Sequence, residues 1–323
     1  MPQHAADRYA PINRAYDATF RPGRLSIGLV APLEANRHDP VPSLTRHVER
    51  ARLADDLGFA ALWLRDVPFN VPSFGDAGQV FDPFVYLGFL AGATERIALG
   101  VASVILPLRH PAHVAKAAAS ADILSGGRLL LGVASGDRPE EYPAMGMGFG
   151  DRGERFRESV AYIRAMAQDR PCIENAHGSP TGGIDMLPKP TGDRLPLLIT
   201  GGSRQDPDWV ARNGDGWMTY PRDAASQMRV VADYRRRIAD AGLPDKPVMQ
   251  SLYIDLAERA DEPPRGIHLG FRSGIDFLRR YLTELRALGI DHVALNLRFN
   301  HADIEDTTHR LASDLLPDFH DED

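Results

Sequence analysis

The segment from Thr200 to Trp209, TGGSRQDPDW, places two glycines, a serine, an arginine and a glutamine directly before an Asp-Pro pair. The glycines allow the backbone to approach a ligand closely and to turn its N–H groups toward it. Asp206 and Pro207 can begin a helix, whose N-terminal end is electrostatically positive. This combination suits a phosphate group. The spacing differs from the dinucleotide pattern G-x-G-x-x-G, and a Gly-Gly bend between a strand and a helix also occurs without any ligand.

The surrounding chain alternates short apolar runs with amphipathic stretches. We predict strands at residues 25–30, 60–64, 97–106, 128–134, 195–200, 216–220, 248–256 and 292–299. Helices are predicted at residues 43–57, 82–94, from 111 onward, 151–168, at 207, 224–241, 273–288 and 302–316. Nearly continuous runs of Val, Ile, Leu and Ala are typical of parallel strands covered by helices on both faces. Eight strand–helix units in roughly 290 residues predict an α/β fold, an eight-stranded parallel β/α (TIM) barrel.

The barrel is expected to span residues 25–317. Residues 1–24 contain no apolar signal segment, and we expect them to form an arm that lies on the barrel or on a partner subunit. Residues 318–323 form a short acidic tail. Residues 170–194 are rich in Pro and Gly and do not fit the regular count, so they are expected to form an insertion with a small hairpin over the barrel mouth.

The composition excludes several functions. A net charge of -7 gives no general attraction for nucleic acid or acidic membranes, and no run of 18 apolar residues occurs, so we expect a cytoplasmic protein. The single cysteine, Cys172, excludes an internal disulfide and a cysteine-cluster metal site. His110 and His113 open a predicted helix rather than facing each other on a strand, so no metal site is expected.

In such barrels the reactive groups gather at the C-terminal ends of the strands. This rule selects residues that follow or end the predicted strands: Glu34, Arg65, Asp66, Ala102, Ser103, Ser135, Gly136, Asp137, Arg138, Gly201 to Gln205, Tyr220, Asn296 and Arg298.

Several segments together resemble one known family. GFAALWLRDV, RIALGVASVILPLRHP, LSGGRLLLGVASGDRPEEY, RGERFRESV, LPKP and TGGSRQDPDWVARNGDGW are similar, in this order, to the bacterial luciferase-like flavin monooxygenases. The resemblance runs from about residue 25 to residue 317. It implies a flavin-binding eight-stranded β/α barrel with an insertion near the mouth.

The resemblance also implies where the flavin lies. In this family the loop after the fifth strand holds the flavin phosphate, which here corresponds to Gly201, Gly202, Ser203, Arg204 and Gln205. The family often has a cis peptide bond behind the flavin ring, at the position that matches Ala102 and Ser103. Ser135 matches a position where luciferases carry an arginine near the phosphate, so anion binding here is expected to depend more on Arg204 or Arg138.

A second position also departs from the family pattern. Where luciferases have an acid/base histidine after the second strand, this chain has Val67. Asp66 is the nearest titratable replacement, but it is equally suited to pair with Arg65 or to hold the loop. Asp66, Arg109 and Asp137 are the expected catalytic residues on the substrate side.

The favoured function is an FMN-dependent monooxygenase that receives reduced FMN from a separate reductase and acts with oxygen on a small organic substrate. The resemblance further implies a homodimer. One alternative is a deazaflavin-dependent hydride-transfer enzyme, in which Arg109, Arg138 and Arg204 serve the acidic tail of the cofactor. Another alternative is a barrel that binds flavin without turnover, which the loss of the histidine at Val67 allows.

Overall fold

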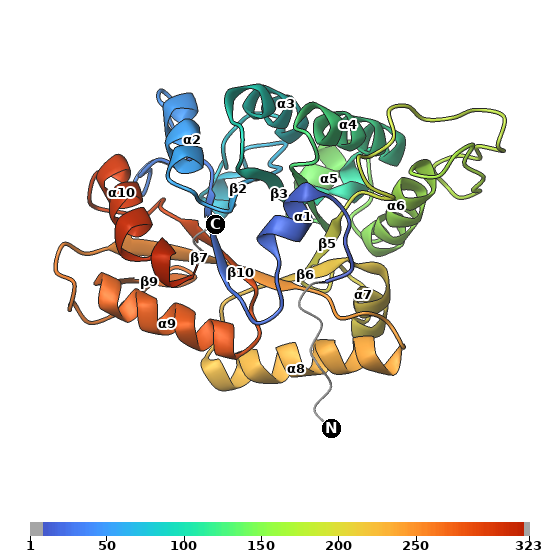
Figure 1. The fold of residues 1–323 in the computed structure, drawn as a ribbon. Helices are drawn as coiled ribbons and strands as arrows, with labels where there is room; N and C mark the ends of the chain where they lie inside the picture. Colours follow the sequence, from blue (N-terminus) through green and yellow to red (C-terminus); the bar gives the residue numbers. More distant parts are fainter. Residues whose placement is uncertain (1–8, 320–323) are drawn as a thin grey trace.

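The computed structural model describes residues 9–319 and contains a closed barrel of eight parallel strands (Figure 1). The barrel strands are β1 (Ser26–Val30), β2 (Ala61–Leu64), β3 (Ala98–Ile105), β4 (Leu129–Ala134), β5 (Leu197–Thr200), β6 (Gly216–Thr219), β7 (Val248–Leu256) and β10 (His292–Asn296). They are neighbours in this order, and β10 closes the barrel by pairing with both β7 and β1. The predicted TIM barrel is confirmed.

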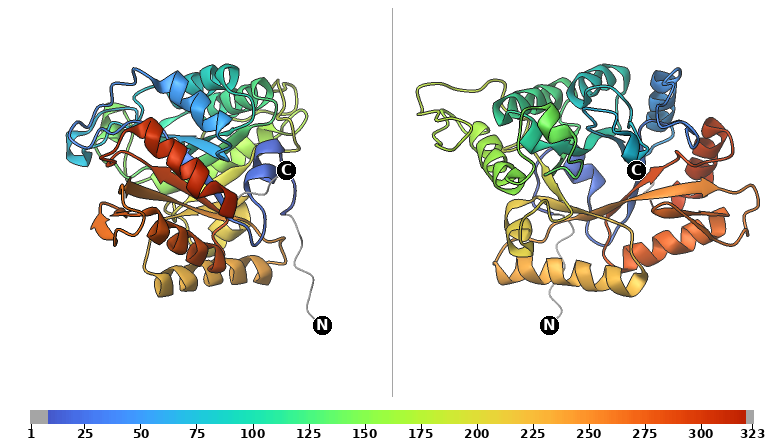
Figure 2. Two further views of the ribbon diagram at one scale, coloured as in Figure 1. Left: turned by 60° about the vertical axis from the view of Figure 1, so that its left-hand side comes forward. Right: turned by 180° about the vertical axis from the view of Figure 1, so that it is seen from behind.

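Helices surround the barrel on all sides (Figure 2). They are α2 (His47–Asp56), α3 (Pro83–Ala93), α4 (Pro111–Leu124), α6 (Arg152–Met166), α7 (Pro207–Asn213), α8 (Ala224–Asp240), α9 (Ile275–Ala287) and α10 (Ile304–Asp314). Several begin at an aspartate whose side chain accepts backbone N–H groups of the first turn: Asp82, Asp206, Asp223 and Asp303. In the part of the chain that is described, no helix is long and apolar enough to cross a membrane.

The connection after β7 contains an element that the sequence did not reveal. A hairpin of β8 (Arg265–Ile267) and β9 (Gly270–Ser273) adds to the outer half of β7, where Tyr253 pairs with Gly270. Only glycine fits at position 270, because a Cβ atom there would lie 1.8 Å from the Tyr253 carbonyl oxygen. The hairpin extends the sheet beyond the closed barrel.

The described part of the N-terminal segment lies across the N-terminal end of the barrel. Its helix α1 (Arg14–Thr19) is seen in front of the barrel in Figure 1. Tyr9, Ile12, Tyr16 and Phe20 are buried there against the innermost side chains of the strands. The expected arm is thus packed on its own barrel over residues 9–24, while residues 1–8 and 320–323 of the expected arm and tail lie outside the described residues.

The insertion at residues 170–194 projects beside α6 (Figures 1 and 2). Two antiparallel bridges, Cys172 with Thr181 and Asn175 with Gly178, form a small hairpin. Asn175 donates to the α6 carbonyl of Glu158 at 3.0 Å, and the His177 carbonyl is 3.1 Å from His110 at the start of α4. The hairpin therefore packs on the outer side of α4 and α6.

The barrel interior is filled by large side chains that glycines accommodate. Trp63 is fully buried, and its indole N–H donates to His292 Nε2 at 2.8 Å. A Cβ atom at Gly100 would lie 2.3 Å from the Trp63 ring, and one at Gly28 would lie 2.8 Å from His292. Close packing of this kind makes the interior a core rather than a channel.

Candidate active site at the barrel mouth

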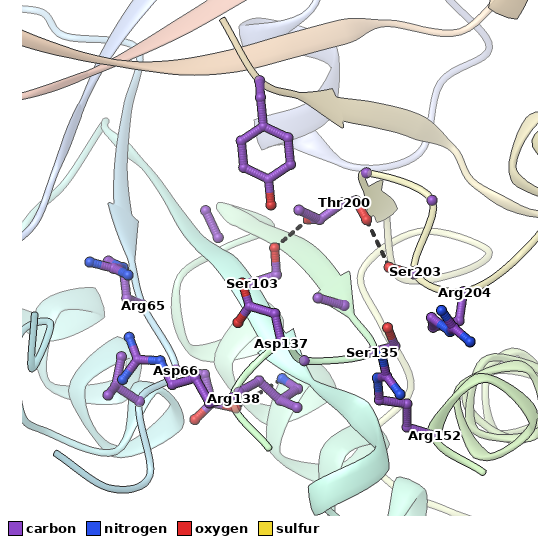
Figure 3. Close-up of a pocket in the computed structure, with 18 residues that line it drawn as sticks. Arg65, Asp66, Ser103, Ser135, Asp137, Arg138, Arg152, Thr200, Ser203 and Arg204 are labelled. Atoms are coloured by element: carbon purple, nitrogen blue, oxygen red, sulfur yellow. Dashed lines mark hydrogen bonds between the residues drawn. The ribbon is translucent and has the colours of Figure 1, made fainter. Parts of the chain in front are cut away.

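A cavity of about 370 Å³ lies at the C-terminal ends of the strands (Figure 3). Its lining comes from the ends of β2 to β6 and the start of α6: Arg65, Asp66, Val67, Ala102, Ser103, Ile105, Ala134, Ser135, Gly136, Asp137, Arg138, Arg152, Thr200, Gly201, Gly202, Ser203, Arg204 and Tyr220. Most of the residues selected by the strand-end rule thus meet in one place.

The loop after β5 has an unusual backbone. Gly201, Ser203 and Arg204 have φ angles of 55°, 43° and 60°. The left-handed region costs a residue with a side chain roughly 1–2 kcal/mol, and such conformations gather at ligand sites. Ser203 is buried and donates to the Thr200 carbonyl at 2.8 Å, which holds the bend in place.

Gln205 is expected to contact the flavin phosphate, but in this structure its side chain bonds residues of α6. Its amide donates to the Gly153 carbonyl in α6 at 2.7 Å and accepts from Arg157 Nε at 3.1 Å. A Cβ atom at Gly153 would lie 2.9 Å from the Arg204 Cβ, so the loop packs directly on the first turn of α6. Gln205 is not among the residues that line the cavity, and its side chain ties the loop to the helix.

Four side chains gather on one side of the cavity: Ser135, Arg152, Ser203 and Arg204 (Figure 3). The Arg152 guanidinium lies 3.5 Å from the centroid of the Phe149 ring and donates to the Phe149 carbonyl, but its buried Nε has no hydrogen-bond partner among the described residues. No ion pair of Arg152 or Arg204 is present in the described part of the chain. This side of the cavity therefore carries two positive charges without a carboxylate partner. Arg152, at the start of the RGER segment, was not selected from the sequence because it begins a helix rather than ending a strand.

The lining of the cavity also contains a polar pair. The peptide bond between Ala102 and Ser103 is cis, and the Ser103 hydroxyl forms a short hydrogen bond with that of Thr200. Thr200 is the last residue of β5. It was not among the predicted site residues, because the set predicted after this strand begins at Gly201.

Asp66 is held in an ion pair with Arg109. Its buried carboxylate accepts the Ile105 N–H at 3.0 Å and two guanidinium N–H groups of Arg109 at 3.0 and 2.7 Å. Arg109 also bonds Asp82 at 2.8 Å. Burial lowers the pKa of Arg109, but the two carboxylates raise it more, so the net shift is upward. Asp66 does not pair with Arg65, and Arg109 is not among the cavity-lining residues. The pair fixes β3 and α3 to the end of β2.

A second ion-pair group fixes the loop between β2 and α3. Asp76 pairs with Arg65 and, at 3.2 Å, with Arg298 at the end of β10. Burial alone would raise the pKa of Asp76, but the positive charge of Arg65 outweighs this effect. The net pKa lies below its ordinary value, so the carboxylate stays ionised. Gln79 is buried and bonds the Arg65 backbone on both sides, accepting its N–H at 2.8 Å and donating to its carbonyl at 2.5 Å.

Two other residues selected by the strand-end rule, Glu34 and Asn296, hold loops in place. Glu34 accepts the N–H groups of residues 43 and 44, and Asn296 accepts that of Arg298.

Asp137 is the one exposed carboxylate of the cavity lining, and no hydrogen bond to it is found in the described part of the chain. Beside it, Arg138 is buried, lies 4.7 Å from the Phe74 ring centroid and donates to the Asp76 carbonyl at 3.2 Å. Glu141 is buried behind them, and neither carboxyl oxygen has a hydrogen-bond partner there. Burial raises the pKa of Glu141 and lowers that of Arg138.

The sequence matches a family model described as luciferase-like monooxygenase over residues 24–306. An uncharacterized protein of Mycobacterium tuberculosis is 31% identical over 239 residues, which are 68% of this chain and 82% of that protein. An F420-dependent hydroxymycolic acid dehydrogenase of the same organism is 28% identical over 64% of this chain and 55% of its own length.

Solved structures share the barrel. A monooxygenase from Streptomyces bottropensis superposes with a TM-score of 0.76 at 21% identity, over 91% of this chain and 99% of that one. The oxygenating constituent of 3,6-diketocamphane monooxygenase from Pseudomonas putida, in complex with FMN, has a TM-score of 0.60 at 18% identity. The match covers 72% of this chain and 68% of that one. These likenesses support the fold.

Proposed function

Because this chain belongs to the luciferase-like monooxygenase family, whose members are oxidoreductases that use flavin or deazaflavin, we propose that it is an FMN-dependent monooxygenase acting on a small organic substrate. The observation that carries the choice of FMN is the compact group of unpaired positive charge at Arg152 and Arg204. A single phosphate group matches this charge and the hydroxyl groups of Ser135 and Ser203. The N–H groups of the bend at Gly201 and Gly202 add further donors.

The other arginines at the mouth argue against the deazaflavin alternative. That cofactor has a longer acidic tail, which needs several basic residues free to bind it. Arg109 is held by Asp66 and Asp82, and Arg65 and Arg298 are held by Asp76. Arg65 and Arg298 thus share one carboxylate, and Arg138 is buried against the Phe74 ring. Of the three arginines expected to serve that tail, Arg204 is the one that is exposed and without an ion pair among the described residues.

The remaining lining residues suit the flavin ring and the substrate. The Ala102–Ser103 segment and Thr200 form a polar wall where the ring would rest. Reduced FMN, when bound, supplies the chemistry that activates oxygen for insertion into the substrate. A separate reductase would supply the reduced FMN, since the chain has no dinucleotide fingerprint.

Asp137 is the side chain best placed to exchange a proton with the substrate, because Asp66 is occupied by Arg109 and Val67 cannot titrate. Tyr220 faces the same cavity, and partial burial together with the Asp137 carboxylate raises the pKa of its phenol. The phenol therefore remains a hydrogen-bond donor at neutral pH. Asp66 and Arg109 act in this proposal by positioning the loops around the cavity.

We extend the proposal to a homodimer in the cytoplasm. Helix α3 exposes Val85 and Phe89, which are 73% and 52% accessible, and the end of α4 exposes Leu124 at 70%. Exposed apolar side chains on two neighbouring helices would suit a contact between subunits. Light scattering of the purified protein measures its oligomeric state.

The test is a titration of the purified protein with FMN and with F420, followed by flavin fluorescence. FMN is expected to bind at least tenfold more tightly than F420. Arg152→Gln removes a charge-assisted contact worth roughly 1.5–3 kcal/mol and should weaken FMN binding about tenfold or more. Arg155→Gln is the matched control, since Arg155 lies on the same helix and pairs with Asp151. Tighter binding of F420 would replace this proposal with the deazaflavin alternative, and binding of neither cofactor would refute both.

A further inference from the structure

A second cavity, of about 480 Å³, lies outside the barrel wall between α7 and α8, which are neighbours in Figure 1. It is lined by Gly201, Gly202, Gln205, Pro207, Val210, Trp217, Arg222, Arg229, Val230, Asp233, Tyr234 and Arg237. Only Gly201 and Gly202 also line the mouth cavity. The two cavities thus lie on opposite sides of the same bend.

The inner walls of this outer cavity are apolar and aromatic. The rings of Trp217 and Tyr234 lie with their centroids 5.2 Å apart and their planes tilted by 34°. Val210 from α7 and Val230 from α8 complete the walls. Space of this size and character fits a planar ring system of about two fused rings.

The rim of the outer cavity is positively charged. Arg222 donates to the Thr219 hydroxyl and the Tyr220 carbonyl, and Arg229 donates to the Ser226 hydroxyl at 3.0 Å. Neither arginine forms an ion pair within residues 9–319. Arg237, by contrast, pairs with Asp208 and Asp233 at 2.6 and 2.7 Å. Two guanidinium groups are therefore left to meet an anion.

The outer cavity is joined mechanically to the bend. The indole N–H of Trp217 donates to the Gly201 carbonyl at 2.9 Å, so the wall residue holds one of the shared glycines. Gln205 lines the outer cavity and ties the same loop to α6. A ligand packed on Trp217 would therefore restrict the loop that carries Ser203 and Arg204.

We propose that the outer cavity binds a small aromatic carboxylate, with the ring against Trp217 and Val230 and the carboxylate on Arg222 and Arg229. Such a ligand stabilises the bend at Gly201 and Gly202, and so increases the affinity of the mouth cavity for FMN. This coupling rests on the proposed function of the loop as the FMN phosphate site, whereas the binding itself does not. Coupling of this kind is reciprocal, so FMN tightens binding of the carboxylate by the same factor.

The test is calorimetric titration with 2-naphthoate and with its neutral amide, with and without FMN. The naphthoate is expected to bind with a Kd below ~1 mM, and the amide at least fivefold more weakly because it lacks the charge. Arg229→Gln should weaken naphthoate binding about fivefold, and Val230→Trp should weaken it at least tenfold by filling the cavity. Arg212→Gln, at an exposed arginine of α7 outside the outer cavity, should leave it unchanged.

Four results decide the proposal and its link to the proposed function. Equal binding of acid and amide, or equal binding to a Val230→Trp variant that is folded by circular dichroism, would overturn it. Saturating naphthoate should lower the Kd for FMN about threefold or more, and an unchanged Kd would overturn the coupling. If naphthoate binds as expected but FMN does not bind at all, the proposed function fails while the outer site stands.

Discussion

The two ends of the barrel differ in how completely their charged side chains are paired. At the N-terminal end, four buried aspartates each accept several hydrogen bonds from the arm, from the residues around the starts of strands, or from arginines: Asp55, Asp122, Asp215 and Asp291. At the mouth, buried polar atoms of Arg138, Glu141, Arg152 and Arg298 have no hydrogen-bond partner within the described residues.

This difference indicates that the N-terminal end contributes mainly to stability and the mouth mainly to ligand binding. Buried charges that are fully paired hold the strands together, and removing one partner leaves the others uncompensated. Unpaired polar atoms and left-handed residues cost stability unless a ligand satisfies them, and they are typical of functional sites. The comparison therefore predicts that substitutions at the two ends will affect different measurements.

The largest effect is expected at the N-terminal end, from Asp215→Ala. The substitution removes the acceptor for the Leu197 N–H at 2.9 Å and for Arg164 and Arg194 at 2.5 and 2.9 Å. Loss of one partner of such a buried pair costs roughly 3–5 kcal/mol. Urea unfolding measures this loss, and the FMN affinity of the folded variant should be unchanged. Asp240→Ala, at an exposed aspartate paired only with Arg236, is the control. A weaker FMN affinity in the Asp215 variant would break the comparison.

At the mouth, Arg204 allows binding and stability to be separated within one residue. Arg204→Gly and Arg204→Ala both remove the positive charge, so each should weaken FMN binding about tenfold. Glycine adopts the φ angle of 60° without steric cost, whereas alanine pays roughly 1 kcal/mol or more. The glycine variant should therefore unfold at higher urea concentration than the alanine variant. Equal midpoints would show that the loop is not held in the left-handed conformation in solution.

The barrel was predictable because its signals are local. Each strand from residue 25 to residue 296 is a short apolar run, and the helices between them carry caps such as Asp82 and Asp206 that can be recognised from the sequence. The hairpin at residues 265–273 was not predicted, because its pairing with β7 depends on a close approach at Gly270 that only the folded chain shows.

The site was predictable only in outline. The strand-end rule selects positions along the chain but says nothing about which side chains neutralise one another. Asp66, Arg109 and Gln205 were expected to contact ligands, and the structure shows each of them bonded to other parts of the protein. Arg152 was missed because it reaches the cavity from a helix, and its role depends on the packing of α6 against the loop after β5.

The smallest effect is a pH dependence at Glu141. Burial raises the pKa of its carboxyl group, and the nearby Arg138 offsets this only in part. Below the ordinary carboxyl pKa the group is protonated in both the folded and the unfolded chain. As the pH rises toward the raised pKa, only the unfolded chain releases the proton, so the free energy of unfolding falls.

Glu141→Gln cannot ionise and should avoid this loss. Unfolding of the two proteins measured from pH 4 to pH 8 should diverge as the pH rises, with the glutamine variant becoming the more stable one. Glu140→Gln, at the exposed neighbouring residue, is the matched control substitution. If the free energies of unfolding of Glu141→Gln and the unsubstituted protein differ by the same amount at every pH, Arg138 pairs with the ionised carboxylate in solution. The mouth would then hold one unpaired charge fewer, and the contrast with the N-terminal end would rest on Arg152 and Arg204.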